Sequence, residues 1–203
     1  MSSSITTPSA PEEALRVLAG ELREEGPEVA GRVVDPVTEP VLGELVAAGP
    51  RCVHAGAEYA VVIESIREGF LLHYGEPRLL RSDDPDLCLL VGDHLYARGI
   101  ERLVHLQDLL AVHELSDLIS LSAQLDAAAE DTTGAAGALW VATCVAIAAG
   151  PSESHESGKA VLRESGDPEP LLRSAREAAE EAGLRDALSG AFEAVECPTA
   201  DRG

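Results

Sequence analysis

A chain of 203 residues is long enough for one domain with a sizeable core and too short for two ordinary ones. Apolar residues make up 45% of the chain and aromatic residues only 3%, and the abundance of Ala and Leu favours helices over strands. The 36 acidic and 15 basic residues give a formal charge of -21, which repels nucleic acid and anionic lipid and excludes both as partners. A bare diphosphate is disfavoured as well, unless local arginines or a divalent metal reverse the field.

The sequence contains no recognisable targeting or membrane-spanning segment. The first residues, MSSSITTPSAPEE, have neither the basic region nor the apolar run of a signal peptide. The longest apolar stretch, residues 135–150, is shorter than a membrane span. We therefore expect a cytoplasmic protein without a membrane span and with reduced thiols. No metal-binding spacing relates the four cysteines, at positions 52, 88, 144 and 197.

The pattern of the chain predicts one all-α domain over residues 11–197, between a disordered tail at 1–10 and a short tail at 198–203. No segment alternates strictly between apolar and polar residues, which argues against strands. Residues 152–166 are polar and contain two glycines, so they are expected to form a loop with at most a short helix. The expected helices cover residues 11–25, 41–48, 53–74, 85–111, 113–130, 135–149 and 170–183, with a last segment at 184–196.

The clearest helix start is the run from Ser82 to Asp86. Asp84 can cap the helix, Pro85 suits its first position, and Asp86 lies near the positive end of the helix dipole. The run is also similar to an acidic metal-binding motif, but helix capping is sufficient to explain its aspartates.

Two carboxylates, Glu64 and Glu68, stand four residues apart in the expected helix 53–74. This spacing places them on one helix face, where they could grip one divalent ion. The other interpretation is an exposed acidic face, on which Arg67 pairs with one of them in solvent. Glu101 and His105 could likewise share a zinc ion, although a solvated helix face is the simpler interpretation.

Residues 64–98 resemble, without a gap, a segment of the trans-isoprenyl diphosphate synthases. In that family the segment contains DDxxD, then RRGxP, then GDYLLAR, and at the same offsets this chain has ESIRE, HYGEP and GDHLYAR. The resemblance implies the isoprenoid-synthase helical bundle in a shortened form. It also implies that Glu64 and Glu68 occupy the positions that bind the Mg²⁺ holding an allylic diphosphate. By the same resemblance, Arg51 and His73 are candidate substrate-binding residues.

Most of the ligand-binding residues of that family are replaced in this chain. Ser65 and Arg67 interrupt the first acidic motif, and His73 with Tyr74 stands where the family has two arginines that clamp a diphosphate. The second aspartate-rich motif has no counterpart after residue 150. Because the mechanism of the family needs three magnesium ions between two facing carboxylate clusters, we expect no catalytic residue and no cofactor, with Mg²⁺ bound only if some activity is left.

The resemblance thus implies a non-catalytic polyprenyl-synthase-like protein, either a pseudo-enzyme or a small partner subunit in isoprenoid biosynthesis. Its partner would be a second copy or an active prenyl diphosphate synthase, because family members pair through bundle helices, and a prenyl diphosphate is the candidate ligand. One alternative is a weak magnesium-dependent prenyl diphosphate binder or synthase that uses Glu64 and Glu68. Another is a helical interaction protein unrelated to the family.

Overall fold

A computed structural model of the chain describes residues 8–127 and 133–195. Within these ranges the regular structure is helical, and the only β-type pairing is an isolated antiparallel bridge between Val33 and Leu80. The all-α class expected from the sequence is therefore confirmed. The described elements are the 3-10 helices η1 (Pro11–Glu13) and η2 (Val53–Ala55) and the α-helices α1 (Ala14–Glu24), α2 (Pro27–Ala30), α3 (Val41–Ala47), α4 (Gly56–Tyr74), α5 (Pro85–Leu106), α6 (Leu109–Ala127), α7 (Thr133–Ala149), α8 (Glu153–Ser165), α9 (Glu169–Glu181) and α10 (Arg185–Val195).

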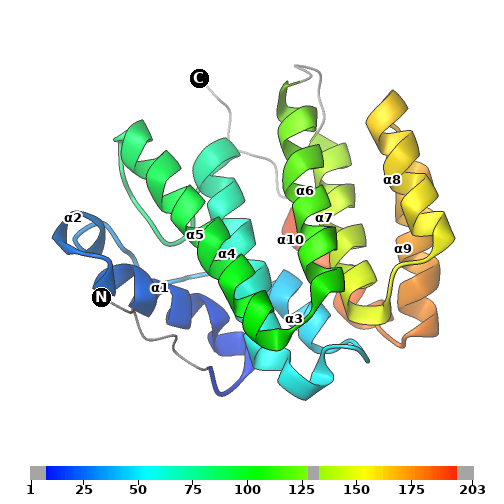
Figure 1. The fold of residues 1–203 in the computed structure, drawn as a ribbon, viewed down its shortest axis with the longest axis horizontal. Coiled ribbons are helices and arrows are strands. Elements are labelled where there is room, and N and C mark those ends of the chain that lie inside the picture. Colours follow the sequence, from blue (N-terminus) through cyan, green and yellow to red (C-terminus); the bar gives the residue numbers. More distant parts are fainter. Residues whose placement is uncertain (1–7, 128–132, 196–203) are drawn as a thin grey trace.

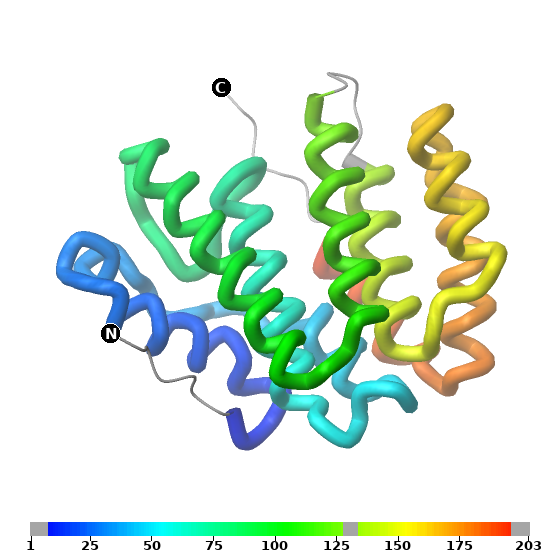
Figure 2. Tube along the Cα trace, viewed as in Figure 1, coloured from blue at the N-terminus to red at the C-terminus, as the bar shows by residue number. Residues whose placement is uncertain are grey.

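Consecutive long helices pair and stand side by side across the molecule. α4 packs against α5, α6 against α7, and α8 against α9, and Figure 1 shows these pairs following one another from left to right. α1 packs on α4 at one end of this row, whereas α3 packs between α4, α7 and α10 (Figure 2). The long helix α4 therefore has neighbours on several sides.

The apolar core divides into two clusters. The larger one surrounds α7, whose side chains from Ala138 to Ala148 are buried, with Trp140 the largest of them. The smaller one joins α1 to α4 and α5 and includes Leu18 and Leu79. Among the described residues, no helix is both long enough and apolar enough to cross a membrane.

Residues 152–166, expected to be a loop, contain the helix α8, so that prediction was wrong. The Ser152 hydroxyl accepts a hydrogen bond from the His155 N–H at 3.1 Å and caps the start of the helix. Gly158 lies inside α8 because α9 passes very close to it: an added Cβ would come within 2.7 Å of the Leu171 Cα. This glycine permits close packing and does not break the helix.

The helix expected over residues 85–111 ends early, at Leu106. Gln107 has a left-handed backbone, with φ of 57°, and turns the chain. The Asp108 carboxylate then accepts a hydrogen bond from the Ala111 N–H at 3.0 Å, next to the start of α6 at Leu109. The sequence has neither Gly nor Pro here, and so lacks the usual signal for a break. The two expected tails lie largely outside the described residues.

Candidate functional site

The two glutamates on α4, Glu64 and Glu68, lie inside the protein. Both are 0% exposed, because α1, α3 and α5 all pack around α4. The interpretation of this helix face as an exposed acidic surface, with Arg67 as a partner in solvent, is therefore wrong.

Arg78, in the loop between α4 and α5, holds both carboxylates. Its Nη1 lies 2.8 Å from Glu64 Oε2, and its Nε donates to Glu68 Oε2 at 3.0 Å. Backbone N–H groups serve the other two oxygens. Gly43 donates to Glu64 Oε1 at 2.9 Å. Arg78 and Leu79 each donate to Glu68 Oε1 at 2.7 Å. Each of the four carboxylate oxygens thus has a partner within 3.0 Å.

This pairing fixes the charge of Arg78. Burial alone would lower the pKa of Arg78, but the two carboxylates outweigh burial and raise its pKa above the ordinary value. The network therefore contains one permanent cation between two carboxylates.

Arg67, on the same helix, turns toward aromatic rings instead of toward the glutamates. Its guanidinium carbon lies 4.8 Å from the ring centroid of Trp140 on α7 and 5.3 Å from that of Phe70. Burial and the nearby charge of Arg78 lower the pKa of Arg67 to about 10. Arg67 is thus still a cation at neutral pH, and it links α4 to α7 by cation–π contact.

His73, expected near a diphosphate, lies in the contact between α4 and α5. Its Nε2 is 3.2 Å from an Asp93 carboxylate oxygen, and its ring stacks on Tyr96 with centroids 5.3 Å apart. Gly92 makes this approach possible, because an added Cβ there would come within 2.5 Å of the His73 ring. The Gly-Asp pair of the resemblance thus has a packing role in this chain.

Arg51, the other candidate substrate-binding residue, belongs to a separate network at the start of α6. Its Nη2 donates to both carboxylate oxygens of Asp108 at 3.1 Å, and the Tyr59 hydroxyl donates to the same carboxylate at 2.7 Å. Burial alone would raise the pKa of Asp108. The hydrogen bonds from the Ala111 N–H, Tyr59 and Arg51, together with the charge of Arg51, outweigh burial and hold the pKa of Asp108 below its ordinary value. Arg51 is not brought to the Glu64 network, since its partner Asp108 lies in the turn between α5 and α6.

The pair Glu101 and His105, weighed as a zinc site, is not arranged as one. The Glu101 carboxylate accepts from Arg98 at 2.7 Å, whereas His105 Nδ1 lies 2.9 Å from the Glu101 backbone oxygen. The solvated helix face is the better interpretation of this pair.

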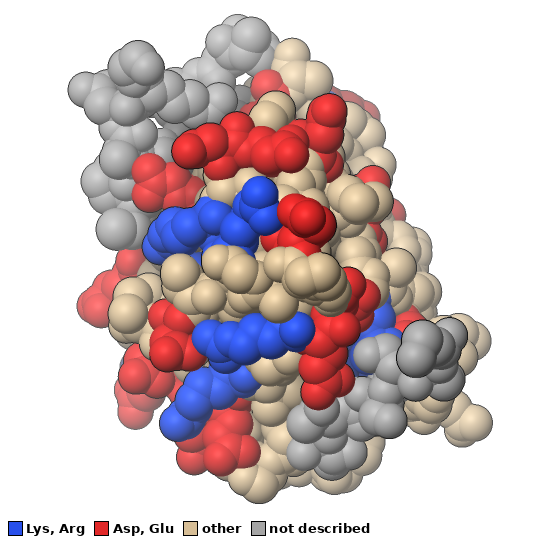
Figure 3. Space-filling model, turned by 90° about the vertical axis from the view of Figure 1, so that its left-hand side faces the viewer, with Lys and Arg blue, Asp and Glu red and all other residues tan. Residues whose placement is uncertain are grey.

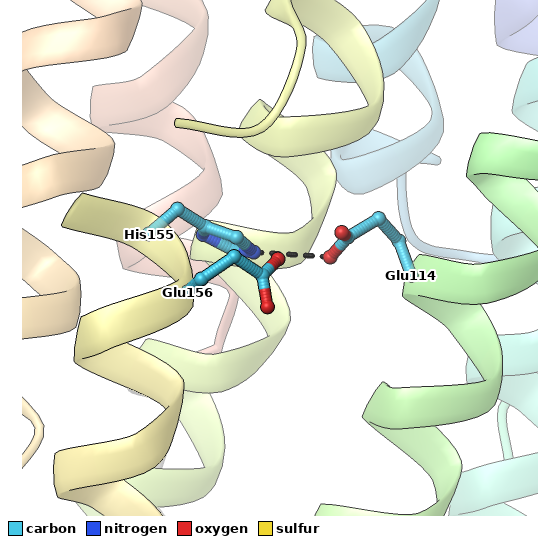
Figure 4. Close-up of side chains that lie close together, drawn as sticks. All are labelled: Glu114, His155 and Glu156. Carbon is cyan, nitrogen blue, oxygen red and sulfur yellow. Dashed lines mark hydrogen bonds and ion pairs between the residues drawn. The ribbon is translucent and has the colours of Figure 1, made fainter. Parts of the chain in front are cut away.

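A second buried charge network, which sequence reasoning missed, joins α6 to α8. His155 Nε2 lies 3.0 Å from Glu114 Oε2, as the dashed line in Figure 4 marks. The Lys159 ammonium lies 2.8 Å from Asp117 Oδ2, 2.9 Å from Glu156 Oε1 and 3.3 Å from Glu114 Oε2. Glu114, His155 and Lys159 are buried.

The pKa values in this network show strong mutual pairing. Burial alone would raise the pKa of Glu114, but His155 and Lys159 outweigh it and hold the pKa below its ordinary value. Burial alone would lower the pKa of Lys159, yet its carboxylate partners raise it. One sequence signal was available: Lys159, the only lysine in the chain, follows Glu156 by three positions and His155 by four, and each spacing brings two side chains together on a helix. It was overlooked because the segment was expected to be a loop.

Another polar feature is an open cleft of about 790 Å³ between the end of α2 and the loop before α5. Its two arginines donate to backbone carbonyl groups: Arg32 to Glu28 and Arg81 to Pro77. The acidic lining residues are Glu76, Asp83 and Asp84. Figure 3 shows the left-hand side of Figure 1, where basic side chains lie among acidic ones. The mixed charge gives an anionic ligand little to bind.

Comparison of the chain with protein-family models, with curated proteins and with solved structures found no match in any of the three. The fold and the networks nevertheless define a class: an all-helical protein whose buried carboxylates are paired internally with arginine, histidine or lysine. The resemblance of residues 64–98 to the trans-isoprenyl diphosphate synthases therefore stays a prediction.

Proposed function

We propose that the chain is a non-catalytic relative of the trans-isoprenyl diphosphate synthases, and that it acts as a small partner subunit of an active synthase. The proposal rests on one observation: Arg78 forms ion pairs with both Glu64 and Glu68. A magnesium ion at this acidic pair would have to displace an arginine and compete with three backbone N–H groups. A hard divalent ion at this pair would also leave the guanidinium of Arg78 without its two carboxylate partners.

The other positions named by the resemblance are engaged in the same way. His73 is paired with Asp93 across two helices, and Arg51 is paired with Asp108. His73 thus connects α4 to α5, and Arg51 connects the segment after α3 to the turn between α5 and α6. The residues that would bind substrate in an active synthase therefore support the fold in this chain, which favours a structural role over a catalytic one.

An exposed apolar face on α5 supports the role of partner subunit. Leu90 is 68% exposed and Val104 is 65% exposed, and Ala97, also exposed, lies midway between them. These residues recur every seven positions and so share one side of the helix, the spacing by which helices of two chains pack together. Leu90 and Val104 are large apolar side chains left exposed on this side of α5, and a partner that covers them would remove their apolar surface from water.

The magnesium-dependent binder is the competing function, and one titration separates the two. We expect the purified chain to show no magnesium-dependent binding of an allylic prenyl diphosphate by isothermal titration calorimetry. Binding in MgCl₂ that disappears on chelation would replace our proposal with the competing one.

Affinity purification from cells that naturally produce the chain tests the partner role. We expect an active prenyl diphosphate synthase to co-purify, and its product length to change when this chain is omitted from the assay. The double variant Leu90→Glu/Val104→Glu should abolish the association, whereas Arg173→Glu, an exposed change on α9, should preserve it. If the synthase is absent, or the product length does not change, the partner role is excluded and an unrelated helical interaction protein becomes the better interpretation.

A further inference from the structure

The network between α6 and α8 brings carboxylates, an imidazole and an ammonium into one cluster. It holds three carboxylates, Glu114, Asp117 and Glu156, against one ammonium, Lys159. His113 Nε2 lies 4.0 Å from Asp117 Oδ2 as well, and the side chains of Asp117 and Glu156 are 28% and 51% exposed. Glu114 and His155, by contrast, are buried, so the packing of α6 against α8 holds these two potential metal ligands in place.

We propose that this network is a binding site for one divalent transition-metal ion, with Zn²⁺ the best fit, held by Glu114, His155 and Glu156. The proposal is independent of the function proposed above. One ligand atom from each of these residues lies within 4.8 Å of the others. Imidazole nitrogen with carboxylate oxygen is a donor set that zinc accepts, and three protein ligands leave one position for water.

The geometry brings the donors together from two helices. Figure 4 shows Glu114 on α6 pointing toward His155 and Glu156 on α8. Nε2 of His155 and Oε2 of Glu114 are 3.0 Å apart, a separation that suits two adjacent ligands of one ion. The backbone N–H of His155 donates to the Ser152 hydroxyl, which caps the first turn of α8, the turn that carries His155 and Glu156.

Lys159 has a defined place when the metal is bound. Its shortest contact is to Asp117 Oδ2, at 2.8 Å, and Asp117 is not among the three metal ligands. The ammonium can keep this contact while the ion takes over Glu114 and Glu156. Two carboxylates then balance the divalent ion, and Lys159 with Asp117 forms a neutral pair. Without metal, the same ammonium spreads over all three carboxylates, which makes it the internal competitor of the ion.

Zinc titration of the chelator-treated full chain tests the site. We expect calorimetry to show one high-affinity Zn²⁺ per chain and the thermal unfolding midpoint to rise with zinc. Glu156→Gln is the main variant, since that side chain is 51% exposed and its loss should leave the fold intact. It should weaken zinc binding by about tenfold or more. His105→Gln, an exposed histidine on α5 that also has a glutamate nearby in the helix, is the matched control and should not change the affinity.

Two further measurements separate a built site from adventitious binding. Lys159→Met removes the competing ammonium, so it should raise the zinc affinity by about tenfold, the scale on which neighbours of a metal ligand act. Cobalt substitution should give a visible spectrum without thiolate charge-transfer bands. The proposal is overturned by absence of zinc binding, by affinity unchanged in Glu156→Gln or in Lys159→Met, or by a thiolate spectrum that assigns the ion to a cysteine.

Discussion

Replacing Arg78 by Met tests the central claim that one arginine neutralises two buried glutamates. The side chain of Arg78 is 19% exposed, and those of Glu64 and Glu68 are 1% and 0% exposed. Removing one partner of a buried ion pair costs about 3–5 kcal/mol, because the other partner is left as an uncompensated charge. Glu68 would keep two backbone N–H donors and Glu64 one, which places the expected loss near the lower limit, at about 3 kcal/mol.

Urea unfolding followed by circular dichroism and by the fluorescence of the buried Trp140 measures this loss. A destabilisation of about 3 kcal/mol corresponds to a decrease of about 6–12 °C in the thermal midpoint of a chain of this size. Arg173→Met, at an exposed site on α9, is the control and should change stability by less than about 0.5 kcal/mol. If Arg78→Met behaves like the control, water reaches the carboxylates, and the argument that magnesium is excluded from them collapses.

Three other predictions concern the fold. Gly49→Ala should destabilise the protein by about 1–3 kcal/mol, because the new Cβ would lie 2.4–2.6 Å from atoms of α7. Gly20→Ala should instead stabilise it by about 0.5–1 kcal/mol, because Gly20 lies in the interior of α1 with open space around it. Comparison of the two urea midpoints checks the pair; equal effects would contradict the close packing at Gly49. Asp84→Ala should lower the free energy of unfolding by about 1 kcal/mol, because the Asp84 carboxylate accepts hydrogen bonds from two N–H groups at the start of α5. The adjacent change Asp83→Ala removes no cap and should lower it by less. Asp108 has a lowered pKa in the folded state, so its contribution to stability is present above its unfolded pKa of about 4 and is lost as the pH falls through the folded value. Unfolding free energies measured from pH 6 downward should therefore decline less steeply in Asp108→Asn than in the unaltered chain, and parallel curves would contradict the assignment.

Local sequence signals predicted the helices that carry their own start and stop residues. Asp84 and Pro85 define the start of α5 as expected, and the Asp84 side chain accepts hydrogen bonds from the N–H groups of Asp86 and Leu87. These interactions lie within a few residues of one another, so the sequence contains all that is needed to find them.

The missed helix and the missed break depend on contacts between distant residues. α8 tolerates Gly158 because Leu171 of α9 lies against it. The break at Gln107 is stabilised by Asp108, whose partners Arg51 and Tyr59 lie far back in the chain. No local pattern shows such partners.

The same limit applies to the charged residues. The sequence by itself determined that the chain is helical, that it is strongly acidic, and that Glu64 and Glu68 share one face of α4, because helix periodicity is a local property. Only the tertiary structure decided that this face is internal and that Arg78 neutralises it. It also brought Glu114 on α6 to His155 on α8, 41 positions further along the chain. The chemistry of a carboxylate depends on which cation the fold places beside it, and that choice is made by packing between helices.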